Sequence, residues 1–247
     1  MAKSLSFWLD ATGMLGTSEV KKKADSLTDL GLTVLANDPY LEFTTTWWII
    51  HVVLARRSGS VWNWFFNDFR EREFERSLCI ESFERHIREH AAKQTTTVVI
   101  QREIACLLQT YARPGSSEVV DPEDATYSPL RSLSLIIKHA DTGRFERTRP
   151  LDQVPLEAFL TCVSALAEDT DASDVPLTAL LSKRNGPGRV FGLDGDAVFE
   201  LAAASSNAYS KEGVSLKTLG ADRYLQVPKD SPAVWLERYF KRIGVVR

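Results

Sequence analysis

The chain has 247 residues and is 44% hydrophobic, which is enough for one large folded domain or two small ones. Lys and Arg number 30 against 33 Asp and Glu, so the net charge of -3 gives no global attraction to nucleic acid and confines any DNA-binding surface to a local patch. Three widely spaced cysteines and short apolar runs exclude a zinc knuckle, a disulfide framework and a membrane span, so we expect a cytoplasmic protein.

The first predicted element is a helix over residues 1–12. Leu5, Trp8 and Leu9 recur in it at helical spacing, and Gly13 stands where the helix should end. We expect these three apolar side chains to pack against the central domain or another subunit.

A basic turn follows this helix, and we interpret it as a wing. A wing beside a helix is placed to contact phosphates, whereas the alternative is a solvated turn. Residues 1–36 are then a partial winged helix. The predicted DNA-binding residues are Lys3, Ser6, Lys21, Lys22 and Lys23.

Residues 37–150 are predicted to form a central helical domain. Residues 44–56 are apolar on almost every face, which indicates a helix buried on all sides. Residues 61–78 carry an aromatic cluster and predict a second core helix. Alternating charges then favour amphipathic helices over 70–93, a capped helix follows over 95–113, and a turn at 141–143 precedes an extended strand.

Residues 151–247 are predicted to form a C-terminal winged-helix-like module. Three helices followed by a hairpin give the outline of that fold. The expected elements are helices at 155–167, 176–183 and 193–206, β-runs at 215–219 and 223–227, and a last helix ending at Gly244. The predicted fold class is therefore mainly α with small β-wings.

The pattern H-x-x-E-H occurs at His86, Glu89 and His90. On a helix, the two histidines would face one side and could bind zinc, with the glutamate activating a water. No distal third ligand can be named, and the stretch lies in the charge-alternating helix. An ordinary solvated face is therefore the favoured interpretation.

His51 interrupts the apolar helix, and two carboxylates lie shortly before it. Carboxylates near a histidine can hold a divalent ion and activate water for phosphodiester cleavage. Asp38, Glu42 and His51 are therefore the candidate catalytic residues, with Asp38 and Glu42 as candidate ligands of Mg²⁺ or Mn²⁺. The alternatives are a core histidine with hydrogen-bonded partners, a turn at Asp38 and a solvated Glu42.

Three segments taken together resemble a known bacterial family. They are SFWLDATGMLG, LTDLGLTVLANDPYLEFTTTWWIIHVVLA and VWNWFFNDFREREF, with the ordered pattern L-G, D-P-Y-L-E, W-x-x-H and W-x-W-F-x-N. The family is domain of unknown function 4007. The resemblance is specific over about residues 4 to 75 and looser beyond them. By position, the family motif falls on Asp38, Pro39, Tyr40, Leu41, Glu42, Trp48, His51, Trp62, Phe66 and Asn67.

The resemblance implies a place in DNA modification. The family includes SspB-like proteins of the Ssp DNA phosphorothioation system, which serves phage defence and also contains a cysteine desulfurase, an ATPase and a sulfurtransferase. SspB-like members are described as DNA nickases, so the resemblance implies DNA binding with metal-dependent nicking. A non-catalytic DNA-binding or adaptor protein of the same system is the alternative. Expected partners are DNA, proteins of the sulfur-modification system and a candidate second copy of the chain, with no membrane.

The resemblance also bears on the N-terminus. Family members carry a segment that runs into the helix beginning here at Met1, so we expect a truncated N-terminus or a shorter subgroup.

Overall fold

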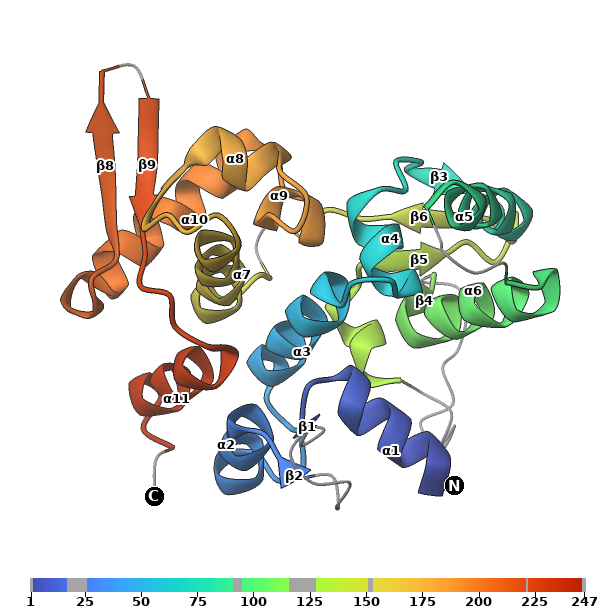
Figure 1. Cartoon of the computed structure of the whole chain (residues 1–247), viewed down its shortest axis with the longest axis horizontal. Helices are drawn as coiled ribbons and strands as arrows, with labels where there is room; N and C mark the ends of the chain where they lie inside the picture. Colours follow the sequence, from blue (N-terminus) through green and yellow to red (C-terminus); the bar gives the residue numbers. More distant parts are fainter. Residues whose placement is uncertain are drawn as a thin grey trace.

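The structure is a computed structural model that describes residues 2–16, 26–90, 95–115, 128–150, 153–220 and 222–245. These residues form mainly helices, with three small sheets between them (Figure 1). The mainly helical class with small β elements is confirmed. No helix in the described ranges has the length and apolar character that a bilayer crossing requires.

The N-terminal part is a helix, a short strand pair and a second helix. Helix α1 (Ala2–Ala11) leads to β1 (Leu15–Gly16), which pairs antiparallel with β2 (Ser26–Leu27), and α2 (Asp29–Asn37) follows. The predicted packing of α1 is confirmed for Trp8 and Leu9, which lie against the core. The side chain of Leu5 is 63% exposed and does not pack on the central domain, so its packing against another subunit stays a prediction.

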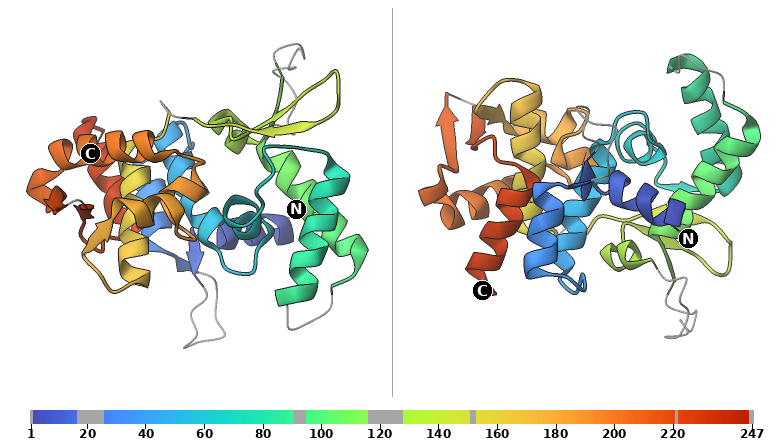
Figure 2. Two further views of the ribbon diagram at one scale, coloured as in Figure 1. Left: turned by 90° about the horizontal axis from the view of Figure 1, so that it is seen from above. Right: turned by 60° about the horizontal axis from the view of Figure 1, so that its bottom comes forward.

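Helix α3 (Thr44–Arg56) lies at the centre of the molecule, as predicted from its apolar character on all faces. It packs against α4 (Val61–Asn67), α7 (Leu156–Asp169) and α11 (Pro232–Arg242). In Figure 2, α3 lies between the C-terminal elements and the sheet-bearing part of the chain. Residues far apart in the sequence therefore meet around this helix.

The predicted long helix over residues 61–78 is wrong beyond Asn67. The chain leaves α4 and becomes extended in β3 (Glu73–Phe74), which pairs with β6 (Phe145–Arg147). The rings of Phe74 and Phe145 stack with centres 5.6 Å apart. A strand pair thus buries an aromatic side chain that the sequence pattern had assigned to a helix face.

A four-stranded sheet with order β3-β6-β5-β4 completes the central part. Strand β4 (Ala112–Pro114) runs parallel to β5 (Ile136–Lys138), and the other pairs are antiparallel. Helices α5 (Arg76–His90) and α6 (Thr97–Tyr111) pack side by side, and the 3-10 helix η1 (Pro129–Leu133) packs on α3 and α6.

The C-terminal part contains the three predicted helices and the predicted hairpin. It forms β7 (Asp174–Pro176), α8 (Leu177–Ser182), α9 (Pro187–Val190), α10 (Gly195–Ala208), the 3-10 helix η2 (Ser210–Glu212), β8 (Ser215–Leu219) and β9 (Asp222–Gln226) after α7. The sheet order is β7-β9-β8, and both pairs are antiparallel. Strand β7 and the short α9 are additions to the predicted set.

One hydrophobic core runs through the chain from α1 to α11. The last helix returns to the N-terminal part, where it packs on α2 and Glu237 accepts a hydrogen bond from Thr33 at 3.4 Å. This core is shared by all three predicted parts. The division at residues 36 and 150 stays a prediction.

Candidate functional site

A basic hollow of about 410 Å³ lies between the edge of the four-stranded sheet and helices α8 and α9. Among the described residues, its lining holds five arginines and no acidic residue. The lining residues are Phe66, Arg70, Arg72, Arg147, Thr148, Arg149, Leu181, Ser182, Gly188, Arg189, Gly192 and Leu193. We call this hollow the arginine cleft.

The register of β3 and β6 brings two pairs of arginines together. Arg70 and Arg72 precede β3, whereas Arg147 ends β6 and Arg149 follows it. The two strands pair antiparallel, and the backbone N–H of Arg147 donates to the carbonyl of Arg72 at 2.8 Å. This pairing brings the two R-x-R segments next to each other, and all four arginine side chains line the cleft.

Two arginines form the floor of the cleft and are held by backbone carbonyls at the end of α4. Arg147 donates to the carbonyl of Phe69, and its guanidinium carbon lies 5.2 Å from the ring centre of Phe65. Arg189 donates to the carbonyl of Asn67 at 3.0 Å. Both side chains are partly buried, and we call them the floor arginines.

The other three arginines are exposed, and we call them the rim arginines. Arg72 pairs with Glu146 at 3.0 Å, and Arg149 lies 3.7 Å from Asp194. Within the described ranges, no ion pair joins Arg70 or either floor arginine to a carboxylate. The cleft therefore carries an excess of positive charge.

The floor arginines are placed at an electrostatic cost. Burial lowers the pKa of Arg147 to about 10, and the charge of Arg70 adds to the effect. Burial likewise lowers the pKa of Arg189, with a further contribution from Arg70. Both groups stay charged near neutral pH, so an anion in the cleft would relieve repulsion between them and Arg70.

A glycine allows α9 to reach the cleft. A Cβ atom at Gly188 would lie 2.3 Å from the carbonyl oxygen of Leu181, so only glycine permits this approach of α9 to α8. Arg189 follows directly. The close contact of the two short helices therefore sets the position of one floor arginine.

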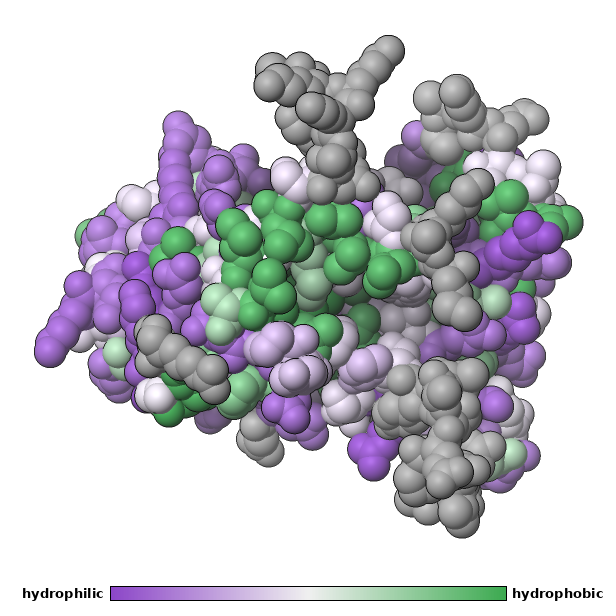
Figure 3. Space-filling view, turned by 90° about the horizontal axis from the view of Figure 1, so that it is seen from below, coloured by the Kyte–Doolittle hydropathy of each residue, from purple (hydrophilic) through white to green (hydrophobic). Residues whose placement is uncertain are grey.

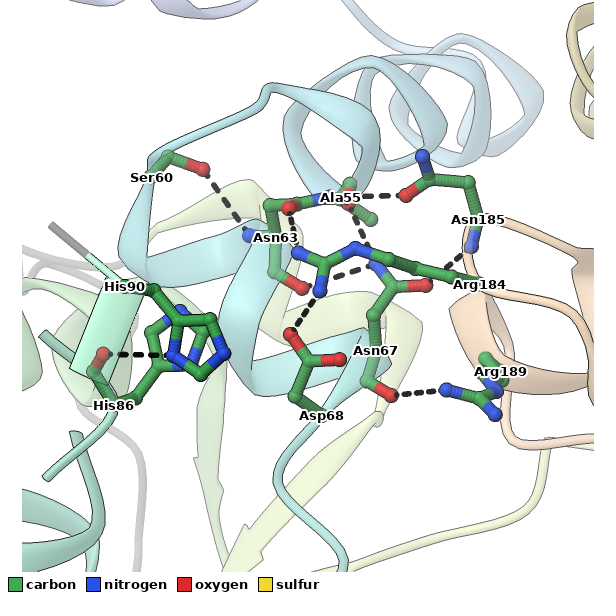
Figure 4. A network of polar contacts seen from close by, with 10 residues as sticks. All are labelled: Ala55, Ser60, Asn63, Asn67, Asp68, His86, His90, Arg184, Asn185 and Arg189. Atoms are coloured by element: carbon green, nitrogen blue, oxygen red, sulfur yellow. Dashed lines mark hydrogen bonds and ion pairs between the residues drawn. The ribbon is translucent and has the colours of Figure 1, made fainter. Parts of the chain in front are cut away.

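A polar network holds the α8–α9 side of the cleft against α4 (Figure 4). Arg184, from the segment after α8, donates to Asp68 at 2.6 Å and to the side-chain oxygen of Asn63 at 2.5 Å. Asn63 in turn donates to the carbonyl of Ala55 at 2.7 Å and to the side chain of Asn185 at 2.9 Å.

Asn67 is fully buried at the centre of this network. Its amide nitrogen donates to the carbonyls of Ala55 and Asn63, both at 3.0 Å, and its amide oxygen accepts from the backbone N–H of Asn185 at 2.6 Å. The backbone carbonyl of Asn67 also accepts the hydrogen bond from Arg189. The network thus fixes the α8–α9 side of the cleft against α4.

The structure gives Asp38 a local bonding role. Its carboxylate is buried and accepts from the backbone N–H groups of Glu42 at 2.7 Å and Phe43 at 3.3 Å, and from the hydroxyl of Thr46 at 2.7 Å. These bonds organise the turn that enters α3. The Glu42 side chain is exposed.

His51 is fully buried and lies between three elements. Its Nε2 is 3.0 Å from the carbonyl of Val190, and its Nδ1 is 2.9 Å from the hydroxyl of Tyr111. A carbonyl only accepts, so Nε2 carries the proton and Nδ1 accepts from the tyrosine. Burial lowers the pKa of His51 to about 4.

The predicted metal-binding residues do not come together. Within the described ranges, no group of three or more His, Cys, Asp or Glu side chains is placed to hold a metal ion, and this includes Asp38 with Glu42 and His51. His86 and His90 do share one face of α5, with ring centres 4.5 Å apart (Figure 4), but Glu89 is exposed and no third ligand joins them.

The predicted DNA-binding residues fall mostly outside the described ranges. Lys21, Lys22 and Lys23 lie there entirely, and so does the side chain of Lys3; Ser6 is exposed on α1. Their predicted role is therefore neither supported nor opposed by the geometry.

The arginines of the cleft were missed by sequence reasoning. The available signal was the repeated R-x-R spacing at Arg70 and Arg72 and at Arg147 and Arg149. It was hidden because residues 70–93 were predicted to be helical, where alternating charges indicate ion pairs. Arg189 gave no signal, since only the fold brings it to the cleft.

Comparison with known proteins assigns the chain to a family. The family model described as "Protein of unknown function (DUF4007)" matches residues 1–240. The chain belongs to the DUF4007 family. No match to this DUF4007 protein is found among curated proteins.

Solved structures agree on the fold. A magnesium-bound crystal structure of SspB has a TM-score of 0.80 and 18% identity, covering 100% of this chain and 76% of the SspB chain. A second SspB crystal structure has a TM-score of 0.77 and 18% identity, covering 99% and 75%. At this identity, the likeness shows a shared fold.

Proposed function

We propose that this protein is a cytoplasmic DNA-binding component of a DNA phosphorothioation-linked defence system of the Ssp type. The arginine cleft carries the proposal, because five converging guanidinium groups without a lining carboxylate suit the phosphates of a nucleic acid. Membership of the DUF4007 family and an SspB-like fold support the Ssp-type system, whose other proteins are then its partners.

We assign the C-terminal part to the winged-helix class. The chain order α7, β7, α8, α10, β8, β9 and the sheet order β7-β9-β8 support this assignment, and α1, β1, β2 and α2 are its partial N-terminal counterpart. In such domains a helix at the position of α10 commonly enters the DNA groove. Here α10 contains Asp196 and Glu200 but no Lys or Arg. Phosphate contacts are therefore assigned to the arginine cleft.

Fluorescence anisotropy with labelled DNA at several salt concentrations tests this assignment. Arg70→Ala and Arg149→Ala should each weaken binding and lower the slope of log affinity against log salt by about 0.9, as expected for one lost phosphate contact. Arg85→Ala is the matched control, because Arg85 is exposed on α5 and does not line the cleft. Equal affinity and slope for all four proteins would remove the cleft from the DNA interface.

Two activities remain compatible with this role, a metal-dependent nickase and a non-catalytic adaptor. The described residues contain no ligand cluster that fits Mg²⁺ or Mn²⁺, so we assign no nicking step to them. Supercoiled plasmid incubated with either metal separates the two activities, because only a nickase yields open circles. Nicking that survives joint replacement of Asp38, Glu42 and His51 in a folded protein would place the reaction elsewhere.

We also assign a second copy of the chain as a partner. Hydrophobic side chains gather on the face that carries α1 and α2 (Figure 3). The large exposed apolar side chains on these helices are Leu5, Phe7, Leu32 and Leu35. A groove of about 500 Å³, lined by Leu5, Trp8 and Leu9 among others, lies beside α1. Exposed apolar surface of this kind is typical of protein interfaces.

A further inference from the structure

We propose that the floor of the arginine cleft binds a terminal phosphate of an unpaired nucleic-acid strand, while the rim arginines hold the adjoining backbone. The proposal rests on the proposed function, since it specifies which part of a nucleic acid enters the cleft. It divides the five arginines into two groups with different tasks.

The difference in exposure between the floor and the rim arginines favours a strand end. Arg147 and Arg189 are partly buried in the lining of a hollow of about 410 Å³, whereas Arg70, Arg72 and Arg149, which also line it, are exposed. The side of a duplex is a broad convex surface whose phosphates can reach the rim. A terminal phosphate on a flexible strand can enter the hollow and reach the floor.

The charge of the site favours a phosphomonoester. The cleft has five guanidinium groups, and the carboxylates paired with them are Glu146 and Asp194, both bound to rim arginines. A diester phosphate carries one negative charge, whereas a terminal phosphate carries about 1.5 to 2 near neutral pH and has three strong acceptor oxygens. A terminal phosphate thus neutralises more of the positive charge of the floor arginines than a diester phosphate does.

The floor arginines are already held in place before a ligand arrives. Arg147 is held by the carbonyl of Phe69 and the ring of Phe65, and Arg189 by the carbonyl of Asn67. Each bond occupies one N–H group and leaves others of the guanidinium fork for an anion. Little side-chain entropy is then lost on binding, which strengthens recognition of a small ligand.

The test compares oligonucleotides of one sequence that differ only at their ends. Single strands with a 5′-phosphate, a 3′-phosphate or no terminal phosphate are titrated by fluorescence anisotropy, beside a blunt duplex without terminal phosphates. We expect one phosphorylated strand to bind about tenfold more tightly than the unphosphorylated strand, as two charge-assisted hydrogen bonds would allow. The 5′ and 3′ strands identify which end is bound.

Two kinds of variant separate the floor from the rim. Arg189→Lys keeps the charge but loses the planar fork, so the affinity ratio between the phosphorylated and the unphosphorylated strand should fall from about tenfold to about one. Arg147→Lys is the second floor variant, and near-ultraviolet circular dichroism checks that both are folded. Arg70→Ala should weaken all strands by the same factor and keep the preference. Arg85→Ala should change neither.

The outcomes distinguish this inference from the proposed function. Binding of all DNA ligands without an end preference, or a preference that survives both floor variants, overturns the inference and leaves DNA binding intact. Inorganic phosphate that competes as well as the phosphorylated strand at equal concentration shows a free-phosphate site and also overturns it. Absence of binding to any DNA ligand removes both proposals.

Discussion

His51 illustrates how one buried side chain connects the core to the candidate site. It hydrogen-bonds Tyr111 on α6 and the carbonyl of Val190 on α9, and its ring lies against Phe66, 4.6 Å away between centres. Val190 directly follows the floor arginine Arg189. The histidine therefore helps to fix the backbone from which that arginine reaches the cleft, in addition to filling the core.

The depressed pKa of His51 predicts acid sensitivity. The folded protein keeps this ring neutral down to about pH 4, whereas the unfolded chain binds a proton near pH 6.5. The unfolded state then holds more protons in this window, so the free energy of unfolding falls as pH falls through it. From about pH 7.5 to about pH 5, His51 should account for a loss of about 2 kcal/mol.

Urea unfolding at the two pH values measures this loss. His51→Gln cannot titrate, so its unfolding free energy should fall by about 2 kcal/mol less than that of the wild type over the same interval. Comparing the two differences cancels the direct destabilisation by the substitution. Equal losses in both proteins would show that His51 does not titrate on unfolding.

At the scale of elements, the turn before α3 shows that an acidic sequence pattern can arise from local hydrogen bonding as well as from metal binding. The acidic residues of NDPYLE suggested metal ligands, yet Asp38 is buried and accepts three hydrogen bonds within its own turn. A carboxylate that is saturated in this way is costly to redirect toward a metal or a substrate. Its local bonds explain its presence without a catalytic role.

Asp38→Asn tests the structural role. The amide nitrogen would face donors that now meet a carboxylate oxygen, so we expect the free energy of unfolding to fall by about 1–3 kcal/mol. Glu42→Gln, at an exposed site in the same turn, should change it by less than about 0.5 kcal/mol. Urea unfolding of the wild type and the two variants provides the comparison. An unfolding free energy of Asp38→Asn equal to that of the wild type would contradict the structural role of Asp38.

Helices could be predicted from the sequence wherever one hydrophobic pattern decided the element. Residues 44–56 form α3 with the predicted bounds, and the C-terminal helices and hairpin follow the prediction closely. The short strand β3 was missed, because its pairing with β6 lies about 70 residues away in sequence. The arginine cleft was missed for the same reason, since register between distant strands and contact with α9 create it.

At the scale of the whole molecule, charge and hydrophobicity are separated between faces. The arginine cleft lies between the sheet and α8–α9, whereas exposed apolar side chains gather on the face of α1 and α2. A nearly neutral chain thus has one surface suited to an anion and another suited to a protein. The proposed DNA ligand and the proposed second copy would therefore occupy different surfaces.

Replacing apolar side chains on α2 should disrupt self-association. Leu32 and Leu35 are 52% and 59% exposed, so Leu32→Glu with Leu35→Glu should leave the unfolding free energy nearly unchanged. We expect sedimentation velocity to show a dimer for the wild type and a monomer for the double variant. Val98→Glu, at an exposed apolar site on α6, is the control. A wild type that stays monomeric at high concentration would contradict this assignment.

The return of α11 to α2 has a consequence for how the protein is made. The bond between Thr33 and Glu237 joins residues 204 positions apart, and α11 also packs on α3 and α7. During translation, the apolar surfaces that these helices share stay uncovered until α11 has left the ribosome. Closure of the core therefore waits for α11, and an mRNA truncated before the codons for this helix would yield an aggregation-prone product rather than a smaller folded protein.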